Sequence, residues 1–81
     1  MKTIWLTKVF CDDDEGKILM EMANSTKGKA VEALAKWCRE QWKAQGMEKK
    51  LNSFDNAAAI DEYFAFWEPE EDYNMIEMEI D

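Results

Sequence analysis

The stretch that most constrains the fold is residues 26–46, because its apolar residues recur at spacings of three and four and so line one side of an α-helix. Ser25 or Thr26 can cap the first turn of this helix, and Gly46 can end it in a left-handed conformation. Two of the apolar residues are tryptophans, each able to bury roughly 150–250 Å². One helix cannot cover that area alone, so we expect a sheet beneath the face formed by Ala30, Val31, Leu34, Trp37, Cys38 and Trp42.

The N-terminal residues predict two of the strands of that sheet. Lys2–Cys11 is rich in β-branched and aromatic residues, and residues 17–23 follow it after the polar stretch 12–16, so we expect an antiparallel hairpin. Both faces of the first strand are partly apolar, which is typical of a central strand. Ile4, Leu6 and Phe10 share one face, and Trp5, Thr7, Val9 and Cys11 share the other.

A second helix and a closing strand are predicted after the connector at residues 47–52. Asn56–Trp67 carries a second apolar stripe, residues 53–56 offer N-cap side chains, and Pro69 prevents the helix from continuing. The closing strand covers residues 73–80. In it we expect Ile76, Met78 and Ile80 to point inward and Glu77 and Glu79 to point outward.

The predicted order is therefore β-β-α-α-β, with residues 70–72 as a solvated acidic turn before the last strand. We predict an α+β fold in which a three-stranded, mostly antiparallel sheet carries two helices packed on one face. The last strand is expected to pair beside the first, because the hairpin leaves that edge free. The length of the chain predicts one compact domain, residues 1–81.

The charge of the chain limits its binding partners. The net charge is −8, and it is uneven: residues 27–50 hold seven basic and three acidic side chains, whereas residues 51–81 hold ten acidic and no basic ones. A negative charge of this size repels polyanions, so we expect no direct binding of nucleic acid or of an anionic membrane. No apolar run approaches the ~20 residues that span a bilayer. Because residues 1–11 also lack the pattern of a signal peptide, we expect a cytoplasmic protein.

The sequence contains no pattern that indicates catalysis. The absence of His excludes Ser-His and Cys-His nucleophile pairs, and three scattered glycines form no phosphate loop. Asp12, Asp14 and Gly16 resemble part of a calcium loop, but Ala23 occupies the position that needs a bidentate Glu. We therefore expect no enzyme activity, no cofactor and no metal site.

Two pairs of residues have both a structural and a functional interpretation. Cys11 and Cys38 could form a disulfide between strand and helix, although two reduced thiols packed as small apolar side chains are favoured. Trp37 and Trp42 could stack on nucleic-acid bases, but they share their stripe with Leu34, which favours a place in the core.

The acidic C-terminal third also has two interpretations. It is either a solvated surface that keeps a small protein soluble, or a docking surface for a strongly basic partner. For the docking interpretation, the predicted contact residues are Asp61, Glu62, Glu68, Glu70, Glu71 and Asp72.

In its compactness, acidity, tryptophan and methionine content and lack of His, the chain resembles small phage-encoded inhibitors, such as anti-CRISPR and DNA-mimic proteins. The resemblance covers the general character of the chain and rests on residues 12–15, residues 68–72 and the carboxylate-only tail, not on a diagnostic motif. It implies a stoichiometric inhibitor that binds a nucleic-acid-handling complex.

We therefore predict a non-enzymatic protein-binding domain, a monomer or a homodimer, whose partner presents a basic surface of the kind that holds nucleic acid. The alternative is a structural or assembly protein that self-associates through a sheet edge or an apolar patch. A third possibility is a nucleic-acid-binding domain that uses the lysines of the first helix.

Overall fold

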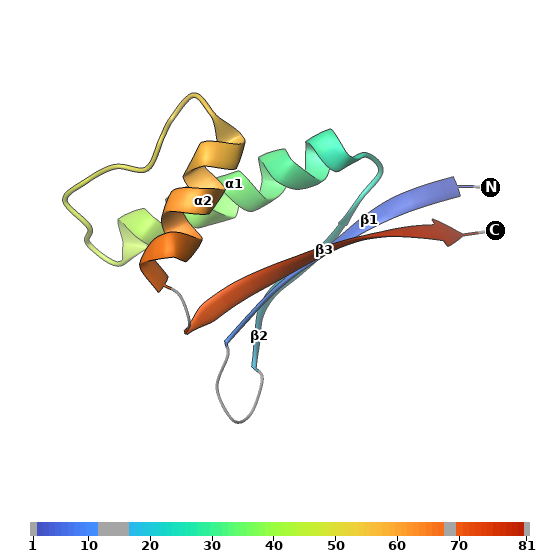
Figure 1. Cartoon of the computed structure of the whole chain (residues 1–81), viewed down its shortest axis with the longest axis horizontal. Helices are drawn as coiled ribbons and strands as arrows, with labels where there is room; N and C mark the ends of the chain where they lie inside the picture. The colour runs from blue at the N-terminus through green and yellow to red at the C-terminus, as the bar shows by residue number, and fades with distance from the viewer. Residues whose placement is uncertain (1, 12–16, 68–69, 81) are drawn as a thin grey trace.

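The computed structural model describes residues 2–11, 17–67 and 70–80, and over these ranges it contains the three strands and two helices in the predicted order. The predicted α+β fold, with both helices packed on one face of an antiparallel sheet, is confirmed (Figure 1). The elements are β1 (Lys2–Cys11), β2 (Ile18–Asn24), α1 (Lys27–Ala44), α2 (Asn56–Trp67) and β3 (Glu71–Ile80).

β1 is the central strand of the sheet, as the apolar character of both its faces predicted. The strand order is β2-β1-β3, and both strand pairs are antiparallel. At one end of the β1–β2 pair, the Cys11 N–H donates a hydrogen bond to the Lys17 carbonyl at 2.8 Å. The register shifts between Val9 and Phe10, where β2 carries an extra residue. The predicted turn at residues 12–16, with its partial calcium loop, lies outside the described residues.

Each helix begins at a side chain that the sequence marks as an N-cap. The Thr26 hydroxyl accepts a hydrogen bond from the Lys29 N–H at 3.1 Å, and α1 ends shortly before Gly46, whose φ is 73°. The Asp55 carboxylate accepts from the Ala58 N–H at 3.1 Å at the start of α2. Local hydrogen bonds between side chain and backbone therefore set where the helices begin.

The core lies between the helices and the face of the sheet that contains Thr7 and Val9, both fully buried. Tyr63 stands at its centre and is 1% exposed. Its ring centroid lies 5.5 Å from that of Trp37 and 5.0 Å from that of Phe64, both in edge-on contacts that add to the stabilisation from burial. The helix stripes predicted from the sequence supply seven of the buried side chains: Ala30, Leu34, Cys38, Trp42, Ile60, Tyr63 and Phe64. Ala35 and Ala59, which were not assigned to either stripe, are buried as well.

The prediction that Ile76, Met78 and Ile80 point into the core is wrong. These side chains are 45%, 42% and 38% exposed. Ile76 is the cross-strand partner of Leu6, which lies on the opposite face of β1 from the buried Thr7. All three apolar residues therefore point away from the helices.

The reason lies at the other end of β3. Tyr73 and Met75 pack against the core cluster on the helix side of the sheet. Because side chains alternate along a strand, their packing fixes the face to which each later side chain of β3 points. Glu77 and Glu79 share their face, so they lie on the helix side of the sheet, although both remain exposed. The even-numbered residues of β3 are left on the side without helices.

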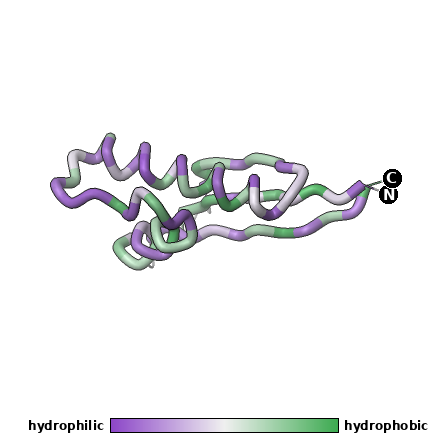
Figure 2. The backbone as a smooth tube through the Cα atoms, turned by 90° about the horizontal axis from the view of Figure 1, so that it is seen from above, coloured by the Kyte–Doolittle hydropathy of each residue, from purple (hydrophilic) through white to green (hydrophobic). Residues whose placement is uncertain are grey.

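The molecule is elongated, and its described helices and strands form two layers. It measures 45 × 35 × 17 Å, and its Cα radius of gyration is 13.2 Å, against about 12 Å for a compact chain of this length. Figures 1 and 2 show that the start of β1 and the end of β3 project beyond both helices. Figure 1 also shows both helices on one side of the sheet, and none of the described helices or strands covers the other side.

Candidate interaction surfaces

The sheet face turned away from the helices, which we call the open face, is largely apolar. It consists of the even-numbered residues of β1, from Lys2 to Phe10, together with their cross-strand partners on β2 and β3. Six of its apolar side chains come from the central strand and one edge strand: Ile4, Leu6, Phe10, Ile76, Met78 and Ile80.

The apolar residues of the open face form two groups along the strands. In one group, Leu6 lies between Ala23 of β2 and Ile76 of β3, and Ile4 is the cross-strand partner of Met78. Cross-strand neighbours of this kind are about 4.5–5.5 Å apart at Cβ, so this group is continuous.

The second group lies at the other end of the open face, beyond Lys8 and its partners. There Phe10 pairs with Ile18, which is 50% exposed. Single exposed apolar residues are normal on a protein surface, whereas a continuous apolar patch on one face indicates an interaction site.

The open face is electrically neutral. Lys2 and Lys8 are its two cations, and Glu21 and Asp72 are its two anions. The whole chain has a net charge of −8, so the residues of the open face are less negative than the chain as a whole. An acidic protein that docks on the open face therefore meets less local repulsion than it would at an acidic surface of the chain.

Two features of the sequence together predict the open face. Ile4, Leu6 and Phe10 already marked the second face of β1 as apolar, and both helices were expected on a single face of the sheet. Together these predict an apolar sheet face without a cover. The wrong orientation assigned to β3 concealed how many further apolar residues that face would receive.

Asp61 and Glu62, the two predicted contact residues on α2, are both exposed, but each contacts a different part of the structure. Asp61 borders a pocket between the helices and the sheet, together with Tyr73. The Glu62 carboxylate accepts a hydrogen bond from the Asn52 N–H at 3.2 Å, beside the loop between the helices. Asp61 and Glu62 therefore have different surroundings, and Asp61 shares the neighbourhood of Tyr73 with Asp72 of β3.

The remaining predicted contact residues lie at or before the start of β3. Glu70 and Asp72 are exposed, but Glu71 is half-buried, and its carboxylate accepts a hydrogen bond from the Tyr63 hydroxyl at 2.9 Å. Glu71 and Asp72 belong to β3, so the prediction of an acidic turn at these residues is wrong. Glu68 lies outside the described residues.

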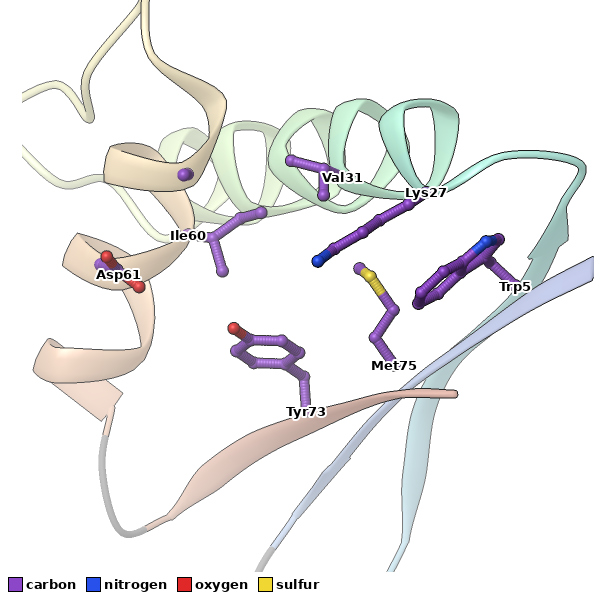
Figure 3. Close-up of a pocket in the computed structure, with 8 residues that line it drawn as sticks. Trp5, Lys27, Val31, Ile60, Asp61, Tyr73 and Met75 are labelled. Atoms are coloured by element: carbon purple, nitrogen blue, oxygen red, sulfur yellow. The ribbon is translucent and has the colours of Figure 1, made fainter. Parts of the chain in front are cut away.

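A pocket of about 280 Å³ lies between the start of α1, α2 and the sheet. Figure 3 shows Lys27 extending from α1 into this pocket, where its Nζ atom lies 5.7 Å from the centroid of the Trp5 ring. Burial, with the nearby carboxylates of Asp61 and Asp72, raises the pKa of Tyr73 at the pocket wall. The pocket therefore presents Lys27, Asp61 and a protonated phenol on largely apolar walls.

Both cysteines are free thiols, as the favoured interpretation predicted, and Cys38 is fully buried. Burial raises the pKa of the Cys38 thiol from 9.0 to about 12, with a further rise from Glu71 and a partial offset from Arg39. Because the thiolate is the reactive form, Cys38 is an inert core residue at neutral pH.

Across residues 2–11, 17–67 and 70–80, no group of three or more His, Cys, Asp or Glu side chains is arranged to hold a metal ion. The described helices include none long and apolar enough to cross a membrane.

Similarity to known proteins gives no indication of function, so a function has to be inferred from the surfaces described above. No protein-family model matches the chain, no curated protein matches its sequence, and no solved structure matches its fold.

Proposed function

We propose that the chain is a non-catalytic protein-binding domain and that the open face is its binding surface. The observation that carries this proposal is the exposure of Ile76, Met78 and Ile80 beside Leu6 and Ile4, on a sheet face that none of the described helices covers. Covering apolar surface releases roughly 25 cal/mol for each Å² removed from water. A partner that covers this face gains that free energy without any rearrangement of the core.

The other features of the chain support a binding role over a catalytic one. The Cys38 thiol is buried and protonated at neutral pH, and the chain has no His to act as a base. The carboxylates of Asp61 and Glu62 are exposed to water, which does not provide the desolvation that general acids need.

The test compares two double variants of β3 that alter opposite faces of the same strand. Ile76→Thr with Met78→Thr removes apolar surface from the open face, and Glu77→Thr with Glu79→Thr is the matched control on the helix side. Threonine keeps a high strand propensity in both. Tagged forms of the wild type and of both variants are incubated with an extract of the producing cells, and the retained proteins are identified by mass spectrometry.

The proposal predicts that proteins retained by the wild type and by the control are lost from the open-face variant. Identical sets of retained proteins for all three forms would contradict it. Circular dichroism confirms beforehand that each variant is folded.

A second candidate function, favoured by the exposure of Asp61, Glu62, Glu70 and Asp72, is the inhibition of a nucleic-acid-handling protein through a basic partner surface. Its attraction would be long-ranged and would weaken with salt. The test is reversal of Asp61 and Glu70 to Lys, because both side chains are exposed and neither belongs to the open face. Retention of a basic protein that is lost in this variant and at high salt, but kept in the open-face variant, would favour this function over the first.

A further inference from the structure

We infer that the protein covering the open face is a second copy of this chain, so that two sheets pack face to face in a four-layer α-β-β-α homodimer. The inference rests on the proposed function, because it names the occupant of the same surface. Sheets packed in this way lie about 10 Å apart, with the apolar side chains of both inner faces between them.

The charge of the open face favours an identical partner. Two copies that met through their acidic edges would bring like charges together, since each chain has a net charge of −8. On the open face, Lys2 and Lys8 balance Glu21 and Asp72. A strongly basic partner gains nothing from this neutral face, whereas a second copy meets an apolar surface that adds no net like charge at the contact itself.

The size of the open face is sufficient for a dimer. Three strands about 4.8 Å apart, with ten residues at about 3.3 Å each on the longest strands, give a flat footprint of roughly 450 Å² for each copy. Two copies that overlap fully cover about 900 Å² of flat footprint, and the accessible area of the side chains standing on it is larger than the flat area. The buried area is therefore close to the roughly 1,000 Å² that a specific interface needs.

Pairing between sheet edges is a poorer route to a dimer. β3 is an edge strand, and it carries Glu71, Asp72, Glu77 and Glu79 without a Lys or Arg. Two β3 strands that paired edge to edge would place several carboxylates near one another, and like charges on neighbouring strands are destabilising. The opposite edge, β2, has only seven residues and is interrupted by the bulge beside Val9 and Phe10.

A second copy also supplies what a short chain lacks. A domain of this size buries only about 60% of the surface of its unfolded chain, so its own core is small. Here that core is confined to the helix side of the sheet. Face-to-face packing would turn the central strand β1 into a strand buried on both faces, which explains its apolar residues at Ile4, Leu6 and Phe10.

The test is sedimentation equilibrium of the untagged chain across a wide range of concentrations. The wild type is expected to reach twice the mass of the 9.5 kDa chain. The variant with Ile76→Thr and Met78→Thr is expected to dissociate with a Kd at least ~100-fold higher, because each copy loses two apolar side chains from the interface. The control variant with Glu77→Thr and Glu79→Thr is expected to keep the wild-type Kd.

Ile18→Thr provides an independent variant on the other edge strand, β2. Ile18 is 50% exposed and is not one of the residues that form the core or pack against it. The variant is also expected to weaken the dimer, so the inference stays testable if the double variant does not fold. A wild-type chain that remains monomeric at all concentrations would overturn the inference, as would a dimer that is insensitive to both open-face variants. A monomeric wild type whose open-face variant still loses its retained proteins would overturn this inference alone and leave the proposed function standing.

Discussion

Tyr63 of α2 donates its hydroxyl hydrogen to the carboxylate of Glu71 at the start of β3, over 2.9 Å. The bond joins the helix layer to the edge strand. It lies two residues before Tyr73, whose packing against the core sets which side chains of β3 face the helices. Burial and the adjacent Glu71 carboxylate raise the pKa of Tyr63, so the phenol stays protonated and remains a donor. Glu71 is therefore a structural residue of the helix–sheet contact.

Tyr63→Phe is expected to lower the free energy of unfolding by about 1–2 kcal/mol, because a hydrogen bond to a charged acceptor is lost and the half-buried carboxylate loses its partner. Tyr73→Phe is the matched control. Its ring packs on Phe64 at 4.7 Å between centroids, a contact that phenylalanine can keep. Urea denaturation measures both variants, and an equal loss in the two would contradict the structural role of the Tyr63–Glu71 bond.

The buried thiol of Cys38 predicts a loss of stability in alkaline solution. Its pKa is raised from 9.0 to about 12 in the folded chain, so the folded state favours the protonated thiol. That stabilisation is complete below pH 9 and is lost as the pH rises towards 12, because the unfolded chain ionises first. Tyr63 and Tyr73, whose pKa values are also raised, act in the same direction at higher pH.

Cys38→Ala isolates the contribution of the thiol. The variant is expected to be less stable at neutral pH by about 1 kcal/mol, from the small cavity it leaves, but to lose less stability between pH 9 and pH 12 than the wild type. Denaturant unfolding at a series of pH values measures the slope. An unchanged slope would show that the Cys38 thiol is not the group responsible.

Arg39 is expected to hold the loop between the helices. Its Nε donates to the Asn52 carbonyl at 2.8 Å and its Nη1 to the Asn56 side chain at 2.9 Å. Arg39→Lys keeps the charge but cannot reproduce this forked geometry, and we expect a loss of about 1–2 kcal/mol. The exchange of the Phe54 amide N–H, which is bonded to the Asn52 side chain at 2.8 Å, should quicken.

Lys36→Ala is the control for Arg39→Lys, because Lys36 is exposed on the same helix. Its effect on stability should remain within about 0.5 kcal/mol. Hydrogen exchange measured by NMR follows the Phe54 amide in both variants. Unchanged exchange in Arg39→Lys would mean that Asn52 holds the loop without help from Arg39.

The sequence was sufficient to predict the elements, because each one has a local signal. The stripes of α1 and α2 and the caps at Thr26 and Asp55 all depend on residues a few positions apart. The direction of β3 has no such signal. Tyr73 and Met75 on one face compete with Ile76, Met78 and Ile80 on the other, and only the packing against the helices decides between them.

The predicted site residues depend on the same kind of long-range information. Glu71 shares its face with Tyr73, so it is brought beneath α2 and hydrogen-bonds to Tyr63, although its neighbours in the sequence suggested a solvated turn. Asp61 and Glu62 are adjacent in the sequence, yet one borders a pocket and the other contacts a loop. A cluster of carboxylates in the sequence does not define one surface in the fold.

The most direct test of a covered open face is methionine oxidation at low and high protein concentration, followed by mass spectrometry. Met78 lies on the open face and is 42% exposed, whereas Met47 lies in the loop between the helices and serves as the internal control. Since oxidation depends on access, Met78 should be oxidised several-fold more slowly in the concentrated sample, with the rate at Met47 unchanged. A ratio of Met78 to Met47 oxidation rates that is the same at every concentration would contradict a second copy on the open face.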